Sequence, residues 1–168
     1  MADPDVVVRA GGPDDVEAIC GFGALVIPDH YAPLIGDEAA AAQVRDWWSV
    51  ERIGAAVAAG LVVVAERVGT IVGVGQRGTD GRAPVIYKLY LAPEVRGHGL
   101  GRRLIDALVA QLPPDADRIR VEHFAANERA GAFYGREGFA VERVEPSPTG
   151  DPRRAVVWRV RRLWPASH

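Results

Sequence analysis

The 168-residue sequence predicts an α+β fold: a single domain over residues 1–168, with a mixed, mostly antiparallel central sheet of about seven strands flanked by about four helices. Two observations predict it. Apolar residues recur with a period of two in some segments and with a helical period in others, so strands and helices share one chain. The composition, 48% hydrophobic and 25% charged, is typical of a soluble globular domain. A chain of this length buries roughly 70% of its unfolded surface around one core.

The first strand and the first helix are expected close to the N-terminus. Three valines at 6–8 form a β-branched run that ends at two glycines. Acidic residues directly after Pro13 suit the positive end of a helix dipole, so a helix is expected to begin there. The buried stripe of this helix consists of residues at helical spacing: Val16, Ile19, Cys20 and Gly23.

A loop and a second helical segment are expected next. Residues 27–36 are predicted to form a loop, because this stretch contains three turn formers, Pro28, Pro33 and Gly36. Residues 37–59 are predicted to be helical, with a break near Ser49 and a C-terminal stop at Gly60.

Three strands are expected in the middle of the chain. The apolar runs 61–68 and 70–76 flank Gly69 and predict a hairpin. The alternation within 84–91 places Lys88 on the same face as Tyr90. Lys88 is the only lysine among twenty basic residues, an imbalance that indicates a GC-rich, bacterial genome.

Helices and strands alternate in the remainder of the chain. The predicted elements are helix 99–112, strand 118–124, helix 127–137, and strands 139–144 and 155–160. Two consecutive prolines end the first of these helices and Gly138 ends the second.

Composition narrows the classes of partner. The net charge is −2, from 20 basic and 22 acidic residues, so no nucleic acid or membrane partner is expected. Cys20, the single cysteine, forms neither an internal disulfide nor a cysteine metal site, and no metal is expected. Residues 1–9 lack the pattern of a signal peptide. The longest uncharged stretch, 53–65, is shorter than the ~20 residues that span a bilayer, so a cytoplasmic location is predicted.

A glycine-rich turn joins the strand that ends at Leu91 to the next helix. Its three glycines, Gly97, Gly99 and Gly101, stand at alternate positions between Arg96 and Arg102. Glycines let backbone N–H groups approach a ligand closely, and a helix N-terminus adds unsatisfied donors. The pattern therefore favours a phosphate or pyrophosphate site, with a ligand-free glycine turn as the alternative.

Two other phosphate-binding motifs fit this turn less well. A Walker A loop ends in Gly-Lys-Ser/Thr, which is absent here. A dinucleotide-binding turn needs a third glycine where this chain has Arg102, although Glu122 stands where that fold carries an acidic residue. Too few residues follow Gly101 for a doubly wound sheet.

A second motif occupies 127–139, with the order N-x-x-A-x-x-F-Y-x-x-x-G-F. Together with the Leu-Ala-Pro step at 91–93 and the R-G-x-G-x-G string at 96–101, it resembles the GNAT superfamily of acetyl-CoA-dependent N-acetyltransferases. The order of elements before and after also matches, so the resemblance covers nearly the whole chain.

The resemblance implies acetyl-CoA as acyl-donor co-substrate. The turn would bind the pyrophosphate, the strand end would pair with the pantetheine arm, and the helix start would contact the cofactor. The cofactor-binding residues so implied are Tyr90, Leu91, Arg96, Gly97, His98, Gly99, Leu100, Gly101, Arg102 and Asn127.

The resemblance also implies catalytic residues. Tyr134 is the phenol that protonates the leaving thiolate, with an aromatic packing role as the alternative. Glu122 is the candidate base, because burial in an apolar strand raises a carboxyl pKa; a solvated or ion-paired residue is the alternative. Glu66 and His123 are weaker candidates, and a chain of water molecules needs no dedicated base.

The predicted activity is acetyl transfer from acetyl-CoA to a primary amine by direct attack. Cys20 lies on a buried helical stripe and is expected to be a core residue, which favours direct transfer over an acyl-enzyme. The acceptor is expected to be an amine-bearing small molecule, and a homodimer is possible. The alternative is an acyl-CoA-binding sensor or interaction module of the same fold without transferase activity.

Overall fold

The computed structural model describes residues 3–81 and 83–163, and the chain divides into two compact units. Unit 1 comprises Met1–Arg77 and Lys88–Gln111, and unit 2 comprises Gly78–Tyr87 and Leu112–His168. Over the described residues there are seven strands, in the order β1-β2-β3-β4-β5-β7-β6, and five α-helices. Strands β4 and β5 pair in parallel, whereas the β1–β2, β2–β3, β5–β7 and β6–β7 pairs are antiparallel. The predicted α+β class is therefore confirmed.

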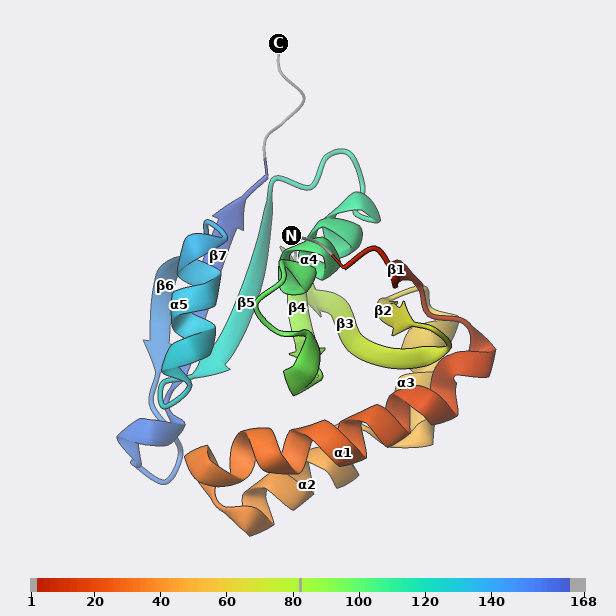
Figure 1. The fold of residues 1–168 in the computed structure, drawn as a ribbon. Coiled ribbons are helices and arrows are strands. Elements are labelled where there is room, and N and C mark those ends of the chain that lie inside the picture. The colour runs from red at the N-terminus through yellow and green to blue at the C-terminus, as the bar shows by residue number, and fades with distance from the viewer. Residues whose placement is uncertain (1–2, 82, 164–168) are drawn as a thin grey trace. The chain divides into compact units, whose positions relative to one another are not determined.

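Unit 1 carries most of the helices. Its elements are β1 (Val6–Ala10), α1 (Val16–Ile35), α2 (Asp37–Trp47), α3 (Val50–Ala58), β2 (Val62–Arg67), most of β3 (Thr70–Asp80), the end of β4 (Ala83–Leu91) and α4 (Leu100–Ala110). Short 3-10 helices stand at Pro13–Asp15 and Pro93–Val95. Helices α1 and α2 lie side by side, in orange in Figure 1. Met1 and Ala2, which belong to the segment 1–9 considered in the sequence analysis, lie outside the described residues.

The loop predicted over 27–36 is wrong, because α1 continues to Ile35 through Pro28 and Pro33. Each proline in a helix interior costs about 3 kcal/mol through the lost N–H donor and steric conflict. Burial of Ile27 and Ile35 in the same span contributes roughly 1.5–3 kcal/mol for each side chain. Packing of α1 against α2 and α3 therefore offsets the prolines.

This longer helix is also notable for its length and apolar composition. Among the described residues, Pro13–Ile35 is one helical stretch long and apolar enough, by length and composition, to cross a bilayer. The sequence reading missed it because the two prolines divided the stretch into a helix and a loop.

The predicted break between the second and third helices is confirmed. Ser49 caps α3, since its hydroxyl accepts a hydrogen bond from the Arg52 backbone N–H at 3.2 Å. The preceding residue, Trp48, is buried against α1. A Cβ on Gly23 would lie 2.3 Å from the Trp48 ring, so only glycine allows this close approach. The glycine thereby sets the position of Trp48 in unit 1.

Unit 2 is a four-stranded arrangement with one helix. Its elements are the first part of β4, β5 (Arg118–Phe124), α5 (Glu128–Arg136), β6 (Ala140–Glu145), a 3-10 turn at Pro152–Arg154 and β7 (Val156–Arg162). Strand β7 lies between β5 and β6, and α5 lies against it (Figure 1). The parallel ladder of β4 with β5 joins Val85 to Arg120 and Ile86 to Val121, and ends there.

Candidate functional site

The turn between β4 and α4 presents a row of backbone donors. Gly97 and Gly99 adopt the left-handed region, with φ of 82° and 78°, which favours glycine. Within residues 3–81 and 83–163, the N–H groups of five consecutive residues, 97–101, have no hydrogen-bond partner. Such a row at a helix start, next to the positive end of the dipole, is the arrangement that binds phosphate groups.

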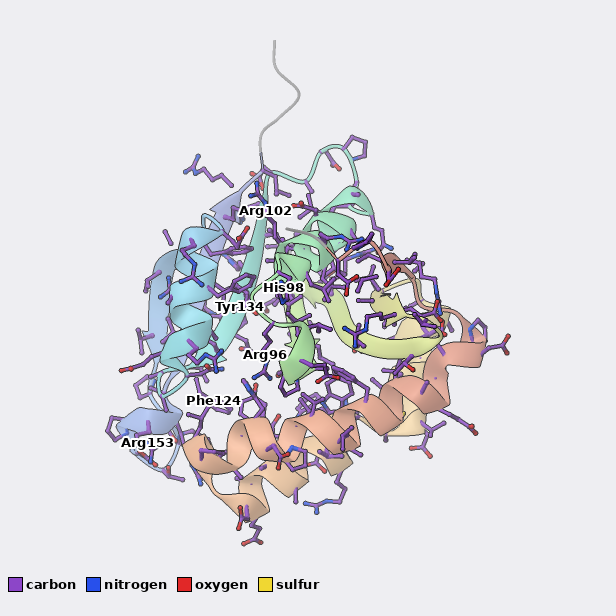
Figure 2. All side chains as sticks on the ribbon, in the orientation of Figure 1. Arg96, His98, Arg102, Phe124, Tyr134 and Arg153 are labelled. Carbon is purple, nitrogen blue, oxygen red and sulfur yellow. The ribbon has the colours of Figure 1, made fainter. Side chains whose placement is uncertain are left out.

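Space is available in front of these donors. A Cβ built on Gly97 or Gly99 meets no atom within 4 Å. Arg96, His98 and Arg102 follow one another along the turn and the first turn of α4 (Figure 2). The Arg96 guanidinium donates to the Leu91 carbonyl at 3.2 Å, so this arginine ties the turn to the end of β4. Leu100 and Gly101 are buried beneath the turn and anchor it to unit 1.

Two hollows of unit 1 border this turn. A cavity of about 330 Å³ is lined by His98 and Arg103, and Arg103 also donates to the Val6 carbonyl at 3.0 Å. A groove of about 650 Å³ is lined by α1 and by Arg96. The predicted site residues His98 and Arg96 therefore each line one of these two hollows.

The Tyr90 side chain belongs to an aromatic cluster of unit 1. Its hydroxyl lies 2.6 Å from the Tyr31 hydroxyl, and its ring makes tilted or edge contacts with His30 and Trp48. The predicted contact of the Tyr90 backbone with a cofactor stays a prediction.

Lys88 lies beside this cluster and is buried, with 7% of its surface exposed. Its ammonium donates to the Gln76 side-chain oxygen at 2.9 Å and lies 5.4 Å from the Trp48 ring centre. Burial, with a contribution from the positive charge of Arg52, lowers the pKa of Lys88 to about 8. The sequence placed Lys88 on the face of Tyr90 but contained no signal for its burial.

Asn127 caps α5 in unit 2. Its side-chain oxygen accepts from the Ala130 N–H at 3.2 Å, and the residue is 8% exposed. The predicted contact of Asn127 with a cofactor thus involves a side chain that also holds the helix start, and it stays a prediction.

Tyr134 lies in the middle of α5 and is buried, with 6% of its surface exposed. Its ring stacks on His123 with centroids 6.2 Å apart and contacts Phe133 and Phe139. Tyr134 therefore has the aromatic packing role that was the alternative to catalysis. This role does not exclude chemistry at the hydroxyl.

His123 is held in one tautomer. Nε2 accepts from the Arg159 guanidinium at 3.0 Å, so the proton resides on Nδ1, which donates to the Phe124 carbonyl at 2.8 Å. Burial lowers the pKa of His123, Arg159 lowers it further, and the bond to the Phe124 carbonyl acts in the opposite direction. Its lone pair is already used, which argues against His123 as the base.

The two candidate glutamates, Glu122 and Glu66, differ in whether their carboxylates are paired with a cation. Glu66 pairs with Arg9 at 3.3 Å in unit 1 and has a structural partner. Glu122 is half-buried in β5, and burial, followed by the carboxylates of Glu145 and Asp80, raises its pKa, whereas Arg143 lowers it. Successive strand residues point to opposite faces, so Glu122 lies on the face of β5 opposite to His123 and the Tyr134 ring.

The predicted site residues therefore fall into two groups. The strand end at Tyr90 and Leu91 and the turn from Arg96 to Arg102 lie together in unit 1. Glu122, Asn127 and Tyr134 lie in unit 2. Sequence reasoning missed Trp158 in β7, which lies directly opposite Glu122, because only the strand register reveals that pairing.

Comparison with known proteins agrees with these motifs. A family model described as an acetyltransferase (GNAT) domain matches residues 58–141, which is half of the chain. A mycothiol acetyltransferase of Propionibacterium freudenreichii subsp. shermanii is 29% identical over 137 residues. The match covers 76% of this chain, which spans only 41% of the length of that relative.

Solved structures of low sequence identity share the fold. The PaiA N-acetyltransferase of Thermoplasma acidophilum, solved in complex with coenzyme A, has a TM-score of 0.80 at 18% identity, over 94% of this chain and 99% of that one. A GCN5-related N-acetyltransferase from Rhodopseudomonas palustris has a TM-score of 0.75 at 20% identity, over 97% and 99% of the two chains.

Proposed function

Because the chain belongs to the acetyltransferase (GNAT) family, we propose that it transfers an acetyl group from acetyl-CoA to a primary amine by direct attack. The observation that carries this proposal is the row of unpartnered N–H groups at 97–101, described above, in front of open space. A row of this kind at a helix start fits a pyrophosphate.

The chain's own residues divide the binding of the co-substrate among them. The N–H groups of the glycine turn hold the pyrophosphate, with Arg96, His98 and Arg102 close to it. The backbone of Tyr90 and Leu91 lies beyond the end of the β4–β5 ladder and offers its polar groups to the amide-bearing pantetheine arm. Asn127 contributes from the start of α5. Bound acetyl-CoA supplies the acetyl group as a reactive thioester.

Two side chains of unit 2 handle the protons. Glu122 accepts a proton from the acceptor ammonium, and its raised pKa brings it closer to neutrality, which suits a base. The neutral amine nitrogen then bonds to the acetyl carbonyl carbon as the thioester C–S bond breaks. The Tyr134 hydroxyl donates a proton to the departing sulfur. The nitrogen of the new amide releases its surplus proton to water, and the Tyr134 phenolate regains a proton from solvent.

The single cysteine supports direct attack rather than an acyl-enzyme. Burial raises the pKa of the Cys20 thiol, and Glu17 raises it further, so the reactive thiolate is disfavoured. Cys20 is half-buried in α1.

Acetyl-CoA at millimolar concentration is expected to raise the melting temperature by about 5 °C, the shift that corresponds to a ligand at roughly a hundred times its Kd. Gly99→Ala is expected to abolish most of this shift, because a Cβ would enter the space in front of the donors. Gly150→Ala is the matched control, since Gly150 has nearly the same φ, 77°, and equally open surroundings. Thermal unfolding with and without ligand measures both.

Two outcomes of that experiment contradict the proposal. The absence of any shift at millimolar acetyl-CoA removes the cofactor site. A shift without thiol release on incubation with a panel of amines leaves the binding site but favours the alternative, a module that binds acyl-CoA and transfers nothing.

Glu122→Gln is expected to lower kcat/KM about tenfold near neutral pH, because water replaces the carboxylate only in part as proton acceptor. Glu122 must be ionised to act, so kcat/KM of the unaltered chain rises as pH increases through its raised pKa. The variant loses this rise. Glu128→Gln, at an exposed position of α5, is the control that keeps it. A pH profile that is unchanged in Glu122→Gln shows that Glu122 is not the base.

A further inference from the structure

Glu122 and Trp158 lie side by side on one face of unit 2. They are directly opposite each other in the antiparallel β5–β7 ladder, so both side chains leave the sheet on the same face. Trp158 is 7% exposed, and among the described residues its indole N–H has no hydrogen-bond partner. A buried donor without a partner costs about 1–3 kcal/mol, and a ligand oxygen placed at this N–H would offset that cost.

Glu122 also lacks a partner. In the described part of the chain, its half-buried carboxylate makes no hydrogen bond and no ion pair. The nearby cation, Arg143, is engaged elsewhere: its guanidinium pairs with Glu145 at 3.0 Å and with Glu142 at 3.5 Å. It also covers the Trp158 ring at 4.7 Å. The Glu122 carboxylate is therefore open to pairing with the ammonium group of a ligand.

The surroundings of the pair define what else a ligand meets. Asp80 and Glu145 are close enough to Glu122 to raise its pKa, so the local charge is negative. Tyr87, which is 41% exposed, and Glu145, whose side chain is 51% exposed, both lie close enough to Glu122 to interact with it electrostatically. An ammonium is attracted to this region, whereas a ligand carboxylate is repelled.

We propose that the acceptor is an α-aminoacyl compound, such as an amino-acid amide or a peptide N-terminus, whose ammonium binds Glu122 and whose carbonyl oxygen accepts from the Trp158 indole N–H. The inference rests on the proposed acetyl transfer and names its acceptor class. Directly opposed strand residues have Cβ atoms about 4.5–5.5 Å apart. An amine and a carbonyl separated by one carbon atom span such a pair. A free amino acid is excluded by its carboxylate, and a plain alkylamine leaves the Trp158 N–H without a partner.

The kinetic test compares three amines: glycinamide, propylamine and glycine. The value of kcat/KM is expected to be at least tenfold higher for glycinamide than for glycine. Trp158→Phe keeps an aromatic ring and removes the N–H donor. The ratio of kcat/KM for glycinamide to kcat/KM for propylamine is therefore expected to fall about tenfold. Comparing this ratio in the variant with the ratio in the unaltered chain cancels the different basicities of the two amines. Trp47→Phe, an exposed tryptophan of unit 1, is the matched control and leaves the ratio unchanged.

A second measurement does not depend on the stability of the variant. In the unaltered chain with coenzyme A bound, the Trp158 indole N–H resonance, assigned by its loss in Trp158→Phe, is expected to move downfield on titration with glycinamide. Propylamine is expected to leave it in place.

The outcomes separate the inference from the proposed function. Two results overturn the acceptor assignment alone. One is transfer to propylamine with an unchanged glycinamide-to-propylamine ratio of kcat/KM in Trp158→Phe. The other is an indole N–H resonance that does not move on titration with glycinamide. Failure to release thiol with any of the three amines, in a chain that binds acetyl-CoA, overturns the transferase activity as well. The absence of acetyl-CoA binding contradicts the proposed cofactor site itself.

Discussion

Tyr134→Phe is expected to lower kcat about 100-fold while leaving the affinity for acetyl-CoA within a factor of about two, because a positioned general acid contributes roughly 10²–10⁴-fold. The substitution removes only the hydroxyl. The stacked and tilted contacts of the ring with His123, Phe133 and Phe139 remain available to phenylalanine, so the melting temperature is expected to change by no more than a few degrees. Steady-state kinetics and a cofactor titration measure the two effects separately.

A matched control removes a phenol elsewhere in the chain. The Tyr31 hydroxyl lies 2.6 Å from that of Tyr90 in unit 1, so Tyr31→Phe deletes a bonded hydroxyl that has no assigned part in proton transfer. Its kcat is expected to stay close to that of the unaltered chain. An unchanged kcat in Tyr134→Phe removes this residue from the mechanism and leaves it the packing role that its burial already shows.

Lys88→Met is expected to raise the free energy of unfolding at pH 7 by about 2–3 kcal/mol, since the buried ammonium loses solvation that its contacts with Gln76 and Trp48 replace only in part. A lowering of the pKa from 10.5 to about 8 corresponds to roughly 3 kcal/mol, from which the lost hydrogen bond to Gln76 is subtracted. Methionine has a similar shape and no charge to desolvate. Chemical denaturation at several pH values measures the difference.

The pH dependence has a definite sign. Between about pH 8 and pH 10.5 the unfolded chain binds more protons at Lys88 than the folded chain, so the stability of the unaltered protein increases with pH in this window. Lys88→Met lacks this increase, and the gap between the two proteins narrows as pH rises. Arg45→Met, at an exposed position of α2, is the control, expected to change stability by less than about 0.5 kcal/mol. A gap that stays constant from pH 7 to pH 10 contradicts the assignment.

Local patterns predicted most elements correctly, and the exception has a physical cause. The predicted strand 118–124 coincides with β5, and the break at Ser49 and the stop at Gly60 were both found. These features depend on alternation, capping and left-handed glycines, which act over a few residues. The span 27–36 was predicted wrongly because proline is a strong local signal, whereas the burial of Ile27 and Ile35 depends on helices further along the chain.

The candidate site likewise has features that follow from local sequence and features that depend on tertiary packing. The glycine turn was recognisable from its sequence, since its conformation and its donors are properties of consecutive residues. The burial of Lys88 under Trp48 required α1, with Gly23, to pack against the sheet of unit 1. The pairing of Glu122 with Trp158 required a register between strands far apart in the chain. Element types and the phosphate-binding turn thus follow from short-range chemistry. The environment of the Lys88 charge and the pairing of Glu122 with Trp158 depend on side chains that only folding brings together.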